Sequence, residues 1–211
     1  MKSIIDALLH LDVTLGVIIS QYGTLSYLIL FLVIFLETGL VLTPFLPGDS
    51  LLFAAGAFAA KGALNPFLLF ILLSVAAIIG DAVNYWIGHR VGARIFEKDR
   101  PFISEEYLKR TQLFYEKHGK KTIIFARFVP IIRTFAPFIA GVGKMPYKDF
   151  VLYNIIGGLA WVALFVYGGF WFGNIPVVQN NFETVIIAMI LVSFVPTVIE
   201  FWKHKNKKQV P

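Results

Sequence analysis

Four ionisable residues lie inside otherwise apolar stretches of this 211-residue chain: the acids Glu37 and Asp49, and the arginines Arg127 and Arg133. A charged group at the centre of a bilayer costs at least about 2.5–3.5 kcal/mol on insertion scales, so four of them require compensation. Arginine stays charged and its planar fork suits phosphate oxygens. A carboxylate in a partly dry site can exchange a proton near neutral pH. Together these residues predict a site that binds an anionic headgroup and changes its affinity with protonation.

A purely structural interpretation of the same four residues is open at this point. The two acids would pair with the two arginines and hold two segments together, with no role in transport. An enzyme, such as a membrane-embedded lipid phosphatase, is disfavoured because no His or Ser is placed with these residues in a nucleophile–base pattern. The four histidines are scattered and no pair has metal-ligand spacing. We therefore expect no enzyme activity, no cofactor and no metal.

Composition indicates a membrane protein. The chain is 57% hydrophobic and 15% charged, with a mean hydropathy of +0.73, whereas a soluble domain has about 45–50% apolar and about 25% charged residues. A soluble fold of this size could not bury so much apolar surface. The formal charge of +6 comes largely from basic residues that flank apolar segments, so we interpret it as a topology signal and not as a nucleic-acid surface.

Three apolar runs reach the roughly 20 residues that cross a bilayer as a helix, namely 64–88, 150–173 and 182–202. Two further apolar stretches, 25–60 and 122–143, are interrupted by charge, glycine and proline. Proline removes a backbone donor, and hydrocarbon offers no replacement partners, so broken or re-entrant segments are expected. The residues predicted to break these hairpins are Pro44, Pro47, Gly48, Pro130 and Pro137.

The two interrupted stretches resemble each other, since residues 45–67 can be aligned with residues 128–150, and each is followed by a long apolar helix ending in Trp-x-Gly. Lysine and arginine crowd the linker 89–121 and the C-terminal tail, so both are predicted to be cytoplasmic. The loop 174–181 has neither and is assigned outside. The two long helices then run in opposite directions, which is inverted-repeat topology, and the hairpin tips meet near the midplane.

The predicted fold is an all-α polytopic membrane protein with an inverted repeat. Each half is a re-entrant broken helical hairpin followed by a transmembrane helix, and a C-terminal transmembrane helix completes the chain. Candidate cavity-lining residues on the first long helix are Asp81, Asn84 and Tyr85. The expected parts are an N-terminal amphipathic or short membrane helix at 1–22, repeat 1 at 23–88, a basic cytoplasmic linker with an amphipathic helix at 89–121, repeat 2 at 122–173, the C-terminal transmembrane helix at 174–202 and a basic cytoplasmic tail at 203–211.

Several motifs resemble the signatures of the DedA family, also called the SNARE-associated or VTT-domain family. They are Glu37, the PGD at 47–49, the GDAVNYWIG at 80–88 and the FARFVPIIRTFAPFIAG at 125–141. The resemblance implies two opposed re-entrant hairpins in a helical bundle and transport driven by the proton-motive force. Bacterial members recycle undecaprenyl phosphate across the inner membrane, and eukaryotic relatives scramble phospholipids. The family's essential acids fall on Glu37 and Asp49, and its essential arginines on Arg127 and Arg133.

We therefore expect a multi-pass transporter of the bacterial inner membrane that translocates an anionic lipid phosphate, with undecaprenyl phosphate as the first candidate. Glu37 and Asp49 would couple protons, and Arg127 with Arg133 would bind the phosphate. The alternatives are a proton-coupled exporter or antiporter of small ions or drugs, and a general phospholipid scramblase. The expected partners are the bilayer, the lipid phosphate and protons, without nucleic acid. The side of the N-terminus, the coupling ion, the proton-accepting carboxylate and assembly into a homo-oligomer are left open.

Overall fold

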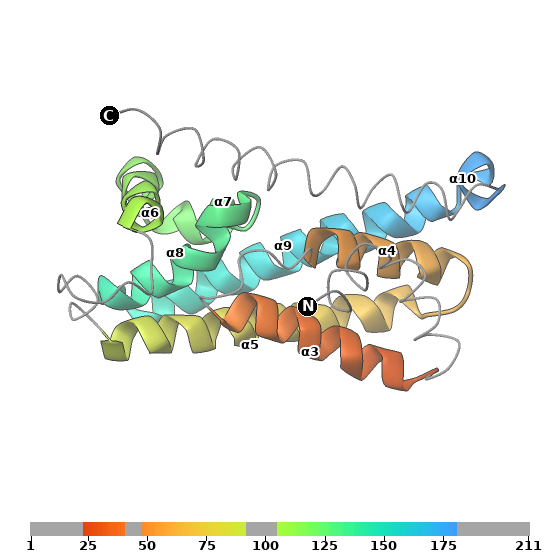
Figure 1. Ribbon diagram of the computed structural model, residues 1–211, viewed down its shortest axis with the longest axis horizontal. Coiled ribbons are helices and arrows are strands. Elements are labelled where there is room, and N and C mark those ends of the chain that lie inside the picture. Colours follow the sequence, from red (N-terminus) through yellow and green to blue (C-terminus); the bar gives the residue numbers. More distant parts are fainter. Residues whose placement is uncertain (1–22, 41–47, 92–104, 181–211) are drawn as a thin grey trace, which may run out of the picture. The chain divides into compact units, whose positions relative to one another are not determined.

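The computed structural model describes residues 23–40, 48–91 and 105–180, and every regular element in this part of the chain is a helix (Figure 1). Within this described part, two helices are long and apolar enough to cross a membrane: α5 (Pro66–Val91) and α9 (Tyr147–Gly173). With 26 and 27 residues they extend about 39–40 Å at about 1.5 Å per residue, more than the ~30 Å hydrocarbon core. The predicted all-helical class is confirmed for the described residues, as are these two long helices.

The remaining helices are short. They are α3 (Leu25–Gly39), α4 (Gly48–Ala60), α6 (Glu105–His118), η2 (Gly119–Lys121), α7 (Thr122–Ala126), α8 (Pro130–Val142) and α10 (Pro176–Asn180). The amphipathic helix expected in the linker is α6. The predicted N-terminal helix at 1–22, Pro44, Pro47, the predicted span at 182–202 and the basic tail lie outside the described residues.

The second interrupted stretch is broken at its proline. α7 ends at Ala126, and α8 begins at Pro130 after an extended Val129 (φ −121°, ψ 105°). A proline disfavours helical backbone at the residue before it, while its own missing N–H costs nothing at the first position of a helix. Pro137 was also predicted to break this segment, but the helix continues through it, so that prediction is wrong for this residue. α8 and α4 have 13 residues each, so both are shorter than the roughly 20 residues that a helix needs to span a bilayer.

Contacts group the described residues into two units. Unit 1 comprises 23–28, 48–69 and 164–180; unit 2 comprises 29–40, 70–91 and 105–163.

In unit 1, α4 packs against the last turns of α9 through backbone contact. A Cβ at Gly56 would overlap the carbonyl oxygen of Val166, and a Cβ at Gly169 would overlap the carbonyl oxygen of Phe53. Gly173 continues the contact, where a Cβ would lie 2.9 Å from the Cα of an α4 alanine. Glycine is required here because the two helix backbones approach more closely than any side chain allows.

In unit 2, α8 packs against the last turns of α5 in the same way. A Cβ at Gly141 would overlap the carbonyl oxygen of Tyr85, and a Cβ at Gly88 would overlap the carbonyl oxygen of Phe138. In each unit, the short helix of one predicted repeat therefore packs against the long helix of the other. The contact is reciprocal, because each helix contributes a glycine and the residue three positions before it.

This repeated contact has a different register on the short helices from that of the predicted internal alignment. It matches Gly56 with Gly141 and Phe53 with Phe138, a separation of 85 residues, whereas aligning 45–67 with 128–150 pairs Gly56 with Ile139. The two Trp-x-Gly motifs have the same spacing as this contact, since Trp86 and Trp171 are also 85 residues apart. The inverted orientation of the two halves and their re-entrant character stay predictions.

Large apolar side chains remain exposed along the long helices. Their number and continuity exceed what a soluble monomer presents to water and suit contact with lipid. They include Phe67, Leu68, Ile71, Val75, Ile79, Val83 and Trp86 on α5, and Leu152, Ile155, Ile156, Leu159, Leu164 and Trp171 on α9.

The α4–α9 contact predicts opposite effects for two adjacent glycines. Gly169→Ala should destabilise the protein by about 1–3 kcal/mol, because the new methyl group collides with the Phe53 backbone. Gly168→Ala should be neutral or stabilising by up to ~1 kcal/mol, because its Cβ would meet only the Phe53 ring at 3.8 Å and alanine favours helix. Thermal unfolding of the detergent-solubilised variants, followed by circular dichroism, measures the difference. Equal unfolding midpoints would contradict the contact.

Candidate functional site

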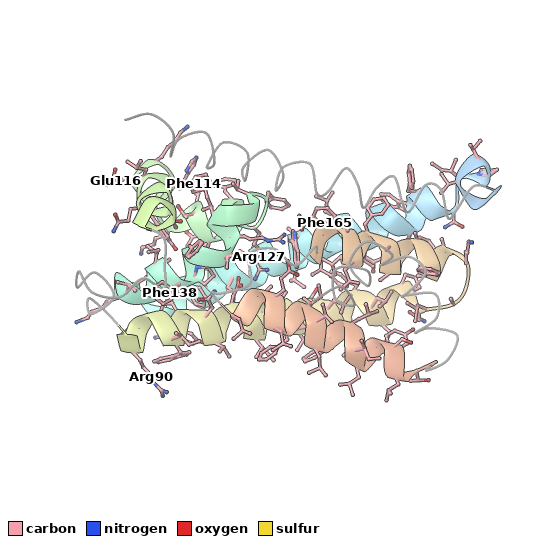
Figure 2. The ribbon with its side chains drawn as sticks, in the orientation of Figure 1. Arg90, Phe114, Glu116, Arg127, Phe138 and Phe165 are labelled. Atoms are coloured by element: carbon pink, nitrogen blue, oxygen red, sulfur yellow. The ribbon has the colours of Figure 1, made fainter. Side chains whose placement is uncertain are left out.

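A buried guanidinium lies at the centre of unit 2. Arg127 follows α7 and is 4% exposed, and Figure 2 labels it in the interior of the helices. Its Nη2 donates to Oδ2 of Asp81 on α5 at 2.6 Å and to Oδ1 of Asn154 on α9 at 2.5 Å. Breaking such a pair on one side would leave an uncompensated charge, so these contacts fix the arginine between two long helices.

α9 is shaped to receive this side chain. A Cβ at Gly157 would lie 3.2 Å from Cδ of Arg127, and a Cβ at Gly158 would lie 3.4 Å from its Nη2. The paired glycines thus form a notch for the guanidinium. Asn154, one turn earlier on α9, donates from Nδ2 to the carbonyl oxygen of Ile78 at 3.0 Å, which directs its amide oxygen toward Arg127.

A second ion pair joins α8 to α3. Nη2 of Arg133 donates to Oε1 of Glu37 at 2.5 Å. The Glu37 side chain is 4% exposed and that of Arg133 is 14% exposed, compared with 5% for Arg127. Arg133 is therefore the more open of the two arginines.

Trp161 of α9 lies beside both arginines. The guanidinium carbon of Arg133 is 5.5 Å from the centre of its ring and that of Arg127 is 5.9 Å away. Both distances are within the ~6 Å reach of a cation–π interaction. The ring is 1% exposed, so the two cations share a rigid apolar surface.

α3 is seated against α5 beside the Glu37 carboxylate. Asn84 donates from Nδ2 to the carbonyl oxygen of Thr38 at 3.2 Å and to that of Thr134 on α8 at 2.9 Å. A Cβ at Gly80 would overlap the Thr38 hydroxyl, so this glycine permits the close approach. Asn84 therefore ties the helix carrying Glu37 to the helix carrying Arg133.

The charged residues enclose a cavity of about 20 Å³. This volume holds about one water and no phosphate group. In this arrangement each of the two arginines forms an ion pair with a carboxylate. The cavity is lined by Glu37, Thr38, Asp81, Arg127, Arg133, Thr134 and Trp161.

The structure brings three of the four predicted charged residues together around this cavity, namely Glu37, Arg127 and Arg133. The ion pairs include one acid that was not among those four. Glu37 pairs with Arg133, but Arg127 pairs with Asp81, which the sequence suggested only as a cavity-lining residue. Asp49 lies in the first turn of α4, in unit 1.

The other candidate residues have different surroundings. Asn84 supports the cavity through its hydrogen bonds to Thr38 and Thr134. The hydroxyl of Tyr85 instead donates to the carbonyl oxygen of Met145 at 2.5 Å, and its ring stacks on Phe150, so it belongs to a separate apolar cluster.

Sequence reasoning missed Asn154 and the role of Trp161. A signal was present, because Asn154, Gly157, Gly158 and Trp161 recur at helical spacing on one face of a predicted span. An asparagine at such a position needs a hydrogen-bond partner inside the bundle. Gly157 and Gly158 in the same pattern make space for Arg127.

The described helices and the buried ion pairs define an all-helical membrane protein. A family model for the VTT domain matches residues 46–171. Protein DedA of Escherichia coli (strain K12) is 54% identical over 206 residues, which cover 96% of this chain and 94% of that protein. An uncharacterized membrane protein of Mycobacterium leprae (strain TN) is 41% identical over 178 residues, covering 84% and 79%. Inner membrane protein YqjA of Escherichia coli (strain K12) is 33% identical over 194 residues, covering 88% of each chain.

No solved structure matches the chain. The family match and these relatives confirm the resemblance: the chain belongs to the DedA family of membrane proteins.

The pairing of Arg127 with Asp81 can be tested against an exposed ion pair. Asp81→Asn should lower the stability by about 3–5 kcal/mol, because a buried guanidinium loses its counter-charge. Asp149→Asn breaks the exposed pair with Lys120 and should cost about 0–1 kcal/mol. Denaturant unfolding in detergent compares the two. The double replacement Asp81→Leu with Arg127→Met should recover much of the loss, and equal stability of the two single variants would refute the assignment.

Proposed function

We propose that this protein carries an anionic lipid phosphate, undecaprenyl phosphate, across the bacterial inner membrane, driven by the proton-motive force. The observation that carries the proposal is the Glu37–Arg133 ion pair. It places a phosphate-binding side chain and a protonatable group in direct contact at 2.5 Å, largely shielded from solvent.

The two arginines are suited to different tasks. Arg127 donates to side chains of two long helices and fills a glycine notch, so it is held in place. Arg133 is more exposed and lies on α8, which continues through Pro137 but lacks the backbone hydrogen bond that this proline cannot donate. Arg133 is therefore the side chain that exchanges its carboxylate for a phosphate, and Arg127 is the fixed cation beside it.

Protonation of Glu37 is the proposed switch. A neutral carboxyl group no longer holds the guanidinium as an ion, so Arg133 can present two parallel N–H groups to a phosphate. Trp161 keeps the cation in position throughout the exchange. Because the cavity of about 20 Å³ cannot hold a phosphate, one part of the protein must move against another to admit the lipid headgroup.

The direction of transport follows from the proton gradient. Glu37 is protonated from the outer side, where the phosphate enters with its tail in lipid. On the cytoplasmic side the proton leaves, Glu37 pairs again with Arg133, and the phosphate is expelled. A proton that crosses with a singly charged phosphate moves no net charge, so the pH difference drives this step, at about 1.4 kcal/mol per pH unit. Asp49 is proposed as a second proton site.

The membrane arrangement is part of the proposal. An inverted repeat, with two opposed re-entrant hairpins and a cytoplasmic linker and C-terminus, would bring the proton site and the phosphate site together near the midplane. The reciprocal glycine contacts of α4 with α9 and of α8 with α5 support such a repeat, because the same pattern occurs once in each unit.

A proton-coupled antiporter of small ions or drugs is the second candidate. It is favoured by the small cavity, in which each arginine already has a carboxylate and could act as an internal counter-charge. A substrate without phosphate would not need the planar fork of the arginine side chain. Sensitivity to replacing that arginine with lysine therefore distinguishes a lipid-phosphate carrier from an antiporter.

Replacing Arg133 with Lys tests the role of the guanidinium. Lysine keeps the charge but loses the bidentate fork, so transport of labelled undecaprenyl phosphate into proteoliposomes should fall roughly 10- to 100-fold, as expected from losing about 1.5–3 kcal/mol. The exposed Arg90 on α5 provides the control Arg90→Lys, which should transport normally. Undiminished lipid transport by the Arg133→Lys variant would refute phosphate binding there, and retained proton-coupled drug export would favour the antiporter.

Replacing Glu37 with Gln tests the switch separately. Glutamine imitates the protonated acid, so the protein should still exchange lipid phosphate between leaflets but lose its response to an imposed pH gradient. Transport with and without that gradient measures the response, and Glu116→Gln on the exposed face of α6 is the control. A Glu37→Gln variant that still accelerates with the gradient would show that the proton binds elsewhere.

A further inference from the structure

A second cavity lies in unit 2, between α6 and the end of α8. Its volume is about 430 Å³, within the ~300–1,000 Å³ typical of small-molecule sites. We name it the α6–α8 pocket. α6 supplies Gln112 and Tyr115, which recur at helical spacing, while Ile139 and Ala140 line it from α8 and Met145 from the following turn. Its interior is predominantly apolar, unlike the small charged cavity beside Arg133.

Aromatic residues indicate that the pocket lies at the level of the membrane surface. The carbonyl oxygen of Met145 accepts a hydrogen bond from Tyr85, whose ring lies 5.5 Å from Tyr147 and 5.8 Å from Trp86. Trp86 is 44% exposed near the end of α5, and Tyr147 is 40% exposed at the start of α9. Tryptophan and tyrosine gather at both membrane–water interfaces, so the pocket opens where lipid headgroups lie.

The rim of the pocket is basic. Lys120 lines its mouth, and its Nζ donates to Oδ2 of Asp149 at 2.5 Å while 58% of its side chain remains exposed. The hydrogen bond to Asp149 raises the pKa of Lys120, so the ammonium stays charged. Exposed Lys144 follows Gly143, which also lines the pocket. An exposed ion pair contributes little, so a phosphate can displace Asp149 or share the lysine with it.

We propose that the α6–α8 pocket binds an anionic phospholipid, with one acyl chain in the apolar cavity and the phosphate between Lys120 and Lys144. Free phosphate could satisfy the lysines but would leave the apolar cavity unused. A neutral lipid could fill the cavity but would make no ionic contact with Lys120 or Lys144. The apolar interior suits an acyl chain, the basic rim suits a phosphate, and the nearby interfacial aromatic residues place both at the membrane surface. An anionic phospholipid carries an acyl chain and a phosphate together.

The pocket is connected to the helix that carries Arg133. The hydroxyl of Tyr115 lines the pocket side of α6 and donates to the carbonyl oxygen of Ala136 at 2.9 Å, three residues beyond Arg133. A bound lipid therefore touches both helices that this hydrogen bond joins (Figure 2 labels Phe114 on α6 and Phe138 on α8). We expect its presence to change the transport rate, and this consequence alone rests on the proposed function.

Binding is tested with the full chain in detergent micelles, using spin-labelled phosphatidylglycerol as the probe. The double variant Lys120→Gln with Lys144→Gln should weaken binding about tenfold or more, because two cationic contacts to the headgroup are lost. Lys61→Gln is the matched control, since Lys61 follows α4 as Lys144 follows α8. Gln112→Trp should block the mouth, whereas Leu113→Trp, at the neighbouring exposed position outside the lining, should not.

Labelled phosphatidylcholine should bind more weakly than phosphatidylglycerol, and inorganic phosphate should not displace either. Wild-type affinity in both the double-lysine variant and Gln112→Trp would overturn the proposal, as would full displacement by inorganic phosphate. These substitutions are on exposed side chains, so folding is expected to be preserved and is checked by gel filtration. Because the assay measures binding without transport, intact lipid binding with no transport would count against the proposed function and not against the pocket.

Discussion

The constraint on which the rest of the site depends is the cost of a guanidinium inside an apolar bundle. Arg127 is buried, so it must have a counter-charge and hydrogen-bond acceptors within reach. Asp81 supplies the charge, Asn154 supplies a second acceptor, and the Gly157–Gly158 notch supplies the space. The Arg127 side chain therefore links α5 to α9 at the end of α7.

That fixed cation gives the second ion pair its significance. Arg133 shares the face of Trp161 with Arg127 but reaches a different helix and retains more exposure. Two arginines that are indistinguishable by residue type therefore differ in how firmly they are held. A permanently compensated charge maintains the architecture, and a less buried one beside it can change partners without the fold losing its central contact.

Sequence alone predicted the elements better than the partners. The apolar lengths gave α5 and α9, and Pro130 located the break before α8, because these features depend on local composition and backbone chemistry. The pairing of Arg127 with Asp81 spans 46 residues and depends on which face of each helix meets the other, which no local pattern contains.

Charge accounting connects this geometry to the proposed use of the proton-motive force. With both carboxylates ionised, the two acids and two arginines around the cavity sum to zero, and an added phosphate would be repelled by two carboxylates in a poorly solvated space. Adding one proton to Glu37 leaves a net charge of plus one, which cancels a phosphate monoester in its monoanionic form; the dianion that predominates at pH 7 would require a second proton. Anion and proton are then favoured together and disfavoured separately, because a buried net charge is costly in either case. In the proposed mechanism, coupling therefore needs no dedicated linkage between distant sites, because it follows from electroneutrality within a single cluster.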